Sequence, residues 1–135
     1  MEWSLKNKIE SSGAVIIREL SIQYIYFSKK NLRSILYNLI SNGIKFKGNE
    51  TPLLRIRAAM SGDDILFSVQ DNGVGIQEKD LAKIFSLYGR LHQEAEGQGG
   101  GLYLAQKIVH AAGGTIVVES EVGRGSKFII HLRKA

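Results

Sequence analysis

The chain has 135 residues, of which 44% are hydrophobic and 23% charged, so its length and composition are those of one globular domain and exclude wholesale disorder. It contains no cysteine, which excludes disulfide bonds, thiolate metal sites and cysteine nucleophiles. The net charge of +5 comes from scattered lysines and arginines, and no uncharged apolar run is long enough to cross a bilayer, so we expect no nucleic-acid partner and no direct membrane insertion.

The first half of the chain alternates between strand and helix patterns. Runs of β-branched and aromatic residues at 14–19 and 22–27 predict two short strands. Apolar residues then recur at intervals of three and four from 30 to 47, which predicts an amphipathic helix ended by a glycine. Alternating apolar residues at 54–60 and 65–71, separated by a tight turn, predict a hairpin.

Glycine gathers in the second half of the chain. Residues 72–101 hold seven of the 15 glycines and show no sustained period, which predicts a long irregular segment such as a functional lid. A helix is predicted at 102–112, followed by strands at 116–120 and 127–133. This clustering of strands favours an α+β fold, a two-layer sandwich whose mixed sheet carries its helices on one face.

A narrow polar stripe is expected on the first of these helices. Asn38, Asn42 and Lys45 are spaced four and three apart, so they share one helix face. Amide oxygens are hard ligands that suit Mg²⁺, and a lysine supplies a point charge for phosphate. The stripe is therefore a candidate metal-phosphate site, and the alternative is an ordinary solvated helix face.

Asp71 ends an apolar row on the second strand of the hairpin. Ile65, Phe67 and Val69 share its parity, so its carboxylate is expected to point to the buried face. A buried carboxylate is costly unless a partner satisfies it, and a ligand with an exposed amino group, such as adenine, would do so. The following glycines would let the backbone turn against that ligand, and the alternative is a strand-ending aspartate in a tight turn.

The glycine-rich run at 97–101 leads directly into the second helix. Its free backbone N–H groups and the positive end of the helix dipole predict an anion site, and the alternative is a flexible loop. The run does not fit two other phosphate motifs. A dinucleotide fingerprint needs glycine at the position of Leu102, and the chain has no Gly-Lys-Ser/Thr for a P-loop.

Taken in this order, the motifs resemble those of one family. The matching stretches are an N box at 35–46, a G1 box at 71–76, an F box at 84–91, a G2 box at 97–102, and closing strands with Gly113-Gly114-Thr115, Glu119-Ser120 and residues 123–128. From about residue 9 to 133 the chain resembles the catalytic ATP-binding domain of bacterial sensor histidine kinases. These belong to the gyrase, chaperone, histidine kinase and mismatch-repair (GHKL) ATPase superfamily, and residues 9–14 resemble the type coupled to PAS or phytochrome sensors.

The resemblance implies a role for each matching residue. Asp71 would accept a hydrogen bond from the adenine amino group, assisted through water by Ser126. Asn42 would ligate Mg²⁺, Asn38 would support it, and Lys45 would face the phosphates of ATP. In the lid at 77–100, Arg90 would reach the γ-phosphate, and the remaining nucleotide-binding residues would be Gly73, Gly75, Ile76, Gly97, Gly99, Gly101 and Leu102.

Asn38 discriminates between branches of the superfamily. The gyrase-like, chaperone and mismatch-repair ATPases carry a glutamate there as a general base, whereas an amide cannot take up a proton at pH 7. This favours a kinase that keeps ATP intact until a histidine nucleophile arrives. The F box departs from the family at residues 87–89, and Gln98 and Gly100 are unusual in the G2 box. We therefore expect nucleotide binding with a loosely packed lid, and the departures bear on catalysis rather than on binding.

The phosphoacceptor is not among the three histidines of this chain, because none of them is followed by the acidic residue that the family's acceptor carries. We therefore expect residues 1–12 to be the remnant of an upstream linker or dimerisation helix, and 13–135 to be the catalytic domain. Its partners would be the phosphoacceptor helices of the same kinase, a homodimer in full length, and a response regulator. The domain would be cytoplasmic, either free or as the cytosolic part of a membrane-bound sensor. The alternative is a degenerate module that binds a nucleotide or a partner without kinase activity.

Overall fold

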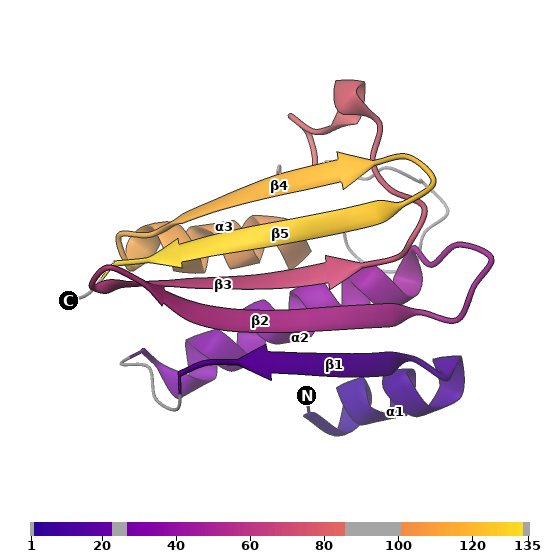
Figure 1. Cartoon of the computed structure of the whole chain (residues 1–135), viewed down its shortest axis with the longest axis horizontal. Coiled ribbons are helices and arrows are strands. Elements are labelled where there is room, and N and C mark those ends of the chain that lie inside the picture. The colour runs from indigo at the N-terminus through magenta and orange to yellow at the C-terminus, as the bar shows by residue number, and fades with distance from the viewer. Residues whose placement is uncertain (1, 23–26, 86–100, 134–135) are drawn as a thin grey trace.

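The computed structural model describes residues 2–22, 27–85 and 101–133, which form a sheet and the helices that cover it (Figure 1). In chain order the elements are α1 (Glu2–Ser12), β1 (Val15–Leu20), α2 (Lys29–Lys45), β2 (Leu53–Ser61), β3 (Asp64–Asp71), a 3-10 turn (Glu78–Asp80), α3 (Gly101–Ala111), β4 (Thr115–Glu121) and β5 (Gly125–Leu132). None of the helices in these ranges is both long and apolar enough to cross a membrane.

The described residues form a five-stranded mixed sheet with the order β1-β2-β3-β5-β4. β1 pairs with β2 in parallel, and the other pairs are antiparallel. In the register of the sheet, Ile16 lies opposite Leu54, and Leu54 lies opposite Asp71. The predicted α+β sandwich with a mixed sheet is therefore confirmed.

Helices α2 and α3 pack side by side on one face of the sheet, and α1 contacts α2 near the edge strand β1 (Figure 1). The period of three and four residues brings Ile35 and Leu39 of α2 into the core, and the same period buries Ala105 and Val109 of α3. Ser28 caps α2, because its hydroxyl accepts a hydrogen bond from the Asn31 N–H at 3.2 Å. The alternating residues of the strands complete the core from the sheet side: Leu54, Phe67, Val69, Ile116, Phe128, Ile130 and Leu132.

Two predictions about these elements need correction, and a third stays a prediction. The helix predicted at 102–112 was expected to include Ala112, but α3 ends at Ala111, and Ala112 follows its last turn and is exposed. Ile22 and Phe27 were expected in a second strand, and neither lies in one, whereas residues 23–26 are outside the described ranges. Residues 2–12 form a helix, as an upstream helix remnant requires, but the origin of this segment stays a prediction.

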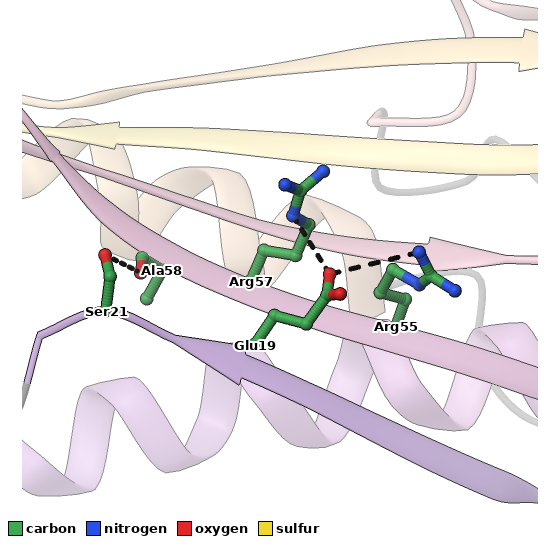
Figure 2. A network of polar contacts seen from close by, with 5 residues as sticks. All are labelled: Glu19, Ser21, Arg55, Arg57 and Ala58. Atoms are coloured by element: carbon green, nitrogen blue, oxygen red, sulfur yellow. Dashed lines mark hydrogen bonds and ion pairs between the residues drawn. The ribbon is translucent and has the colours of Figure 1, made fainter.

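On the sheet face opposite the helices, a charged cluster joins β1 to β2 (Figure 2). Glu19 Oε1 lies 3.1 Å from Arg57 Nε and 3.9 Å from Arg55 Nη1, and all three side chains are about half exposed. Beside this cluster the Ser21 hydroxyl donates to the Ala58 carbonyl at 3.0 Å, which fastens the end of β1 (Figure 2). Exposed ion pairs lose most of their Coulomb energy to solvent and side-chain entropy.

Glu19→Gln is therefore expected to lower the free energy of unfolding by less than about 1 kcal/mol, and by less still in high salt. Urea unfolding at low and high salt measures both effects. Glu78→Gln removes the same charge from another element and serves as the control. A loss above about 2 kcal/mol would contradict the assignment of this cluster to a weak surface network.

Candidate functional site

Asp71 lies at the end of β3 with its carboxylate on the helix-covered side of the sheet. It continues the row of Phe67 and Val69, as the parity of the strand predicted. Its Oδ1 accepts two backbone hydrogen bonds, from the Gly73 N–H at 2.9 Å and from the Ser126 N–H at 3.2 Å. The carboxylate is thus fixed by its own turn and by the start of β5.

Burial raises the pKa of the Asp71 carboxyl above its ordinary value, and the two N–H groups of Gly73 and Ser126 oppose this rise without cancelling it. The ionised form therefore carries a desolvation cost that its backbone partners only partly offset. A ligand that donates a further hydrogen bond to this carboxylate would stabilise the ionised form. The Asp71 carboxylate is accordingly held in a fixed orientation in which it can accept a hydrogen bond from a donor group of a ligand.

Helix α2 approaches Asp71 through a glycine. A Cβ on Gly43 would lie 2.5 Å from Leu54 Cδ2 and 3.2 Å from the Asp71 Cβ, so a side chain here would displace Leu54 and crowd Asp71. Gly43 follows Asn42 directly, which carries the predicted polar stripe to the same end of the sheet. Sequence reasoning missed Gly43 as a site residue, although a glycine inside a strongly periodic helix was the available signal.

The polar stripe on α2 is only partly solvated. Asn38 and Asn42 are partly buried, and their predicted contact with a metal and phosphates stays a prediction. Lys45 is exposed in the last turn of the helix, with its Nζ 5.8 Å from the centroid of the Phe46 ring. The stripe therefore ends close to the turn that follows Asp71.

The turn after Asp71 packs against protein backbone on both sides. A Cβ on Gly73 would lie 2.6 Å from the Phe46 carbonyl oxygen, and the same oxygen accepts the Val74 N–H at 3.0 Å. Gly75 has φ +80° and lies against the Glu121 carbonyl, where no side chain could fit. The missing side chains of the two glycines make room for the end of α2 and for β4, and their predicted approach to a ligand stays a prediction.

Asn72, between these residues, ties the turn to the start of β2. Its Oδ1 accepts the Leu53 N–H at 2.9 Å, and its Nδ2 donates to the Thr51 carbonyl at 3.1 Å. An amide side chain can do both because it carries an acceptor and donors. Asn72 therefore supports the position of Asp71 from the side of β2.

The hairpin between β4 and β5 closes the site from the other side. Gly125 has φ +127°, and a Cβ there would overlap the Asp71 carbonyl oxygen, so the absence of a side chain lets the start of β5 lie this close to β3. The backbone N–H of Ser126 donates to the Asp71 carboxylate, and the predicted assistance of Ser126 through water stays a prediction. Its hydroxyl lies 2.7 Å from that of Ser120, a residue that sequence reasoning quoted but gave no role.

The remaining predicted residues are described only in part. Gly101 begins α3, Leu102 packs against the core, and Ile76 is buried next to the turn. Arg90, Gly97 and Gly99 lie outside the described residues. The structure thus brings Asp71, the turn after it, Gly43 and the start of β5 together, and their contact with a nucleotide stays a prediction.

The chain is similar in sequence and in structure to known proteins. Residues 28–135 match the family described as histidine kinase-, DNA gyrase B- and HSP90-like ATPase. The phytochrome-like protein Cph1 of Synechocystis is 39% identical over 131 residues, which cover 96% of this chain and only 17% of that protein. The catalytic domain of histidine kinase ThkA superposes with a TM-score of 0.82 at 25% identity, over 98% of this chain and 86% of that one. Full-length ShkA in complex with AMPPNP superposes with a TM-score of 0.81 at 28% identity, over 96% of this chain and 27% of that one.

Proposed function

This chain belongs to the histidine kinase-, DNA gyrase B- and HSP90-like ATPase family, as the ATPase domain of a sensor histidine kinase, and we propose that it binds Mg²⁺-ATP and donates the γ-phosphate to a histidine of an upstream domain. The observation that carries this proposal is the Asp71 carboxylate, which is desolvated, fixed by two backbone N–H groups, and able to accept one more hydrogen bond. The adenine amino group is a donor of this kind. The similar protein ShkA was crystallised with AMPPNP, an ATP analogue.

The residues of α2 would hold the metal and the phosphates. The Asn42 amide oxygen would ligate Mg²⁺ with support from Asn38, and the ammonium of Lys45 would face the phosphates. The backbone at Gly101 and Leu102, where α3 begins, supplies N–H groups and the positive end of a helix dipole for an anion. Gly97, Gly99 and Arg90 would complete this phosphate site.

The transfer step would rest on positioning and charge stabilisation. Phosphoryl transfer needs little covalent help from the protein once the donor phosphate and the acceptor are in line. At the position of a general base this chain has the amide of Asn38, which holds no proton for water activation at pH 7. We assign the acceptor histidine to an upstream domain, because none of the three histidines of this chain is followed by the acidic residue that the family's acceptor carries.

Isothermal titration of the chain with Mg²⁺-ATP tests the binding step. We expect saturable binding of ATP and at least about tenfold weaker binding of GTP, because guanine presents a carbonyl acceptor where adenine presents an amino donor. Two acceptors that face each other would repel. Absence of any binding heat, supported by an unchanged melting temperature with ATP, would refute the proposal.

Asn42→Ala tests the assignment of the metal ligand. We expect this variant to bind Mg²⁺-ATP about tenfold more weakly than wild type, equivalent to about 1.4 kcal/mol, while ATP binding in EDTA changes little. Calorimetry with and without Mg²⁺ measures the difference. Asn31→Ala, in the first turn of the same helix, controls for the loss of an amide from α2. Equal losses with and without Mg²⁺ would remove Asn42 from the metal site.

A second assay separates a kinase from a degenerate nucleotide-binding module. The chain is mixed with a matched phosphoacceptor-helix domain and ATP labelled at the γ-phosphate. Acid-labile phosphate on the acceptor domain is expected for a kinase, because phosphohistidine is hydrolysed by acid. ATP binding without such transfer, in the presence of a competent acceptor, would instead establish the non-catalytic module. The homodimer and the response regulator remain proposals that depend on the parent protein.

A further inference from the structure

Ser120, on β4, connects the two loops that enclose Asp71, and it belongs to none of the roles assigned above. Its Oγ accepts the Ile76 N–H at 2.8 Å, where the chain leaves the turn after Asp71. The same hydroxyl donates to the Gly125 carbonyl at 2.9 Å and lies 2.7 Å from Ser126 Oγ. One side chain therefore contacts both the exit of the Asp71 turn and the start of β5.

These contacts use the whole hydrogen-bonding capacity of a hydroxyl. A serine has one proton to donate and two lone pairs that can accept. With the Ser120 proton on the Gly125 carbonyl, its lone pairs receive the Ile76 N–H and the Ser126 O–H. The direction of every bond around Ser120 Oγ is then fixed, and the hydroxyl has no remaining capacity for a ligand.

The peptide unit between Gly125 and Ser126 connects Ser120 to Asp71 by hydrogen bonds. Its carbonyl accepts from Ser120 at 2.9 Å, and its N–H donates to Asp71 Oδ1 at 3.2 Å. The C=O and N–H of a trans peptide point in opposite directions in one plane, so a bond that fixes the carbonyl also fixes the N–H. Ser120, this peptide and the Asp71 carboxylate form a continuous hydrogen-bonded chain, in which each bond polarises the next.

We infer that Ser120 is a positioning residue, which aims the Ser126 N–H at the Asp71 carboxylate and thereby sets the acceptor geometry of the nucleotide site. The effect of Ser120 on nucleotide binding rests on the proposed function. Its hydrogen bonds to the protein do not depend on that function. Ser120 acts through the Gly125–Ser126 peptide and does not touch the ligand.

The ionisation of Asp71 reports on this peptide. Burial raises the pKa of Asp71, and the N–H groups of Gly73 and Ser126 lower it. Among the described residues, no charged side chain contributes to this shift of the pKa. Loss of the Ser120 hydroxyl frees the Gly125 carbonyl and loosens the Ser126 N–H. The pKa of Asp71 should then rise further, because one of its two opposing influences is weakened.

The test follows the Asp71 carboxyl by carbon-detected NMR during a pH titration of the domain without nucleotide. We expect a higher midpoint in Ser120→Ala than in wild type. Ser21→Ala removes a serine hydroxyl that donates to a carbonyl at the far end of β1, and we expect it to leave the midpoint unchanged. Ser126→Ala keeps the N–H that contacts Asp71, so we expect a smaller rise than for Ser120→Ala.

The second readout is the affinity for Mg²⁺-ATP as a function of pH. Ser120→Ala should weaken binding about fivefold at neutral pH, and the fall of affinity on acidification should begin at a higher pH than in wild type. An unchanged Asp71 midpoint in a folded Ser120→Ala domain overturns the inference. A raised midpoint in Ser120→Ala, together with a wild-type domain that fails to bind ATP, upholds the inference and refutes the proposed function. If Ser120→Ala does not fold, Ser120→Cys replaces it, because a thiol is a weaker donor and acceptor than a hydroxyl. The titration midpoint of Asp71 should then rise as well, but by a smaller amount.

Discussion

Asp71→Asn is expected to melt at a higher temperature than wild type at neutral pH and to bind Mg²⁺-ATP about 10- to 150-fold more weakly, which corresponds to the loss of a hydrogen bond to a charged group, about 1.5–3 kcal/mol. The asparagine oxygen can still accept the N–H groups of Gly73 and Ser126, so the turn is preserved. Its amide nitrogen, however, presents donors where the adenine amino group also donates. Binding therefore falls while the fold is retained.

The gain in stability follows from the direction of the pKa shift. The folded-state pKa of Asp71 is raised above the ordinary value of 3.8, so the folded protein holds the carboxyl proton more tightly than the unfolded chain. Ionisation then costs stability, and this cost is absent below pH 3.8, grows as pH rises through the folded-state pKa, and is complete above it. An asparagine cannot ionise and avoids the cost.

Thermal unfolding of both proteins between pH 3 and pH 8, followed by circular dichroism, measures this behaviour. The two melting temperatures should converge at acid pH and separate as pH rises. Asp63→Asn, in the exposed turn between β2 and β3, removes the same charge and should bind ATP like wild type. An Asp71→Asn domain that is less stable than wild type throughout this range would contradict the assignment of a desolvated carboxylate.

Gly125→Ala is expected to lower the free energy of unfolding by about 3 kcal/mol or more. Two costs add at this position. The φ of +127° is one that an L-residue with a side chain rarely adopts, and the new Cβ would overlap the Asp71 carbonyl oxygen. That oxygen belongs to the backbone of a central strand, which cannot move aside as a flexible side chain could. The clash would also displace the Ser126 N–H and weaken nucleotide binding.

Gly123→Ala is the matched control, two residues away in the same hairpin. Gly123 has φ +88°, but a Cβ there would meet nothing within 4 Å, so only the backbone cost of about 1 kcal/mol applies. Urea unfolding of the two variants separates the clash from the dihedral strain. Equal losses in both would mean that the close approach of Gly125 to β3 contributes nothing to stability.

Much of the fold could be predicted because its signals are local. The period of α2, the alternation in β2 and β3, and the parity that directs Asp71 inward depend on residues close in sequence, and the structure confirms them. The order of the strands, with β5 between β3 and β4, depends on contacts between distant segments and could not be derived in this way.

The same limit explains what was missed in the site. Gly43, Gly125 and Ser120 matter because another segment of the chain approaches them, and no local pattern reveals which segment that is. The motif at 71–76 was recognised as a unit, but the close approach of its glycines to Phe46 and Glu121 could not be predicted, because those two residues are distant in sequence. The motifs identified the family, whereas the contacts that hold Asp71 in place required the structure.

The register of the sheet places Asp71 in one row with a residue of the edge strand β1. Ile16 is the second residue of β1 and follows α1 closely in the sequence. In the register of the sheet it lies in one row with Leu54 and Asp71. Two strand spacings, about 10 Å, separate the ends of this row, and the residue between them is completely buried. In the order of the sheet, this row therefore connects the N-terminal edge to Asp71 without passing through β5 or β4.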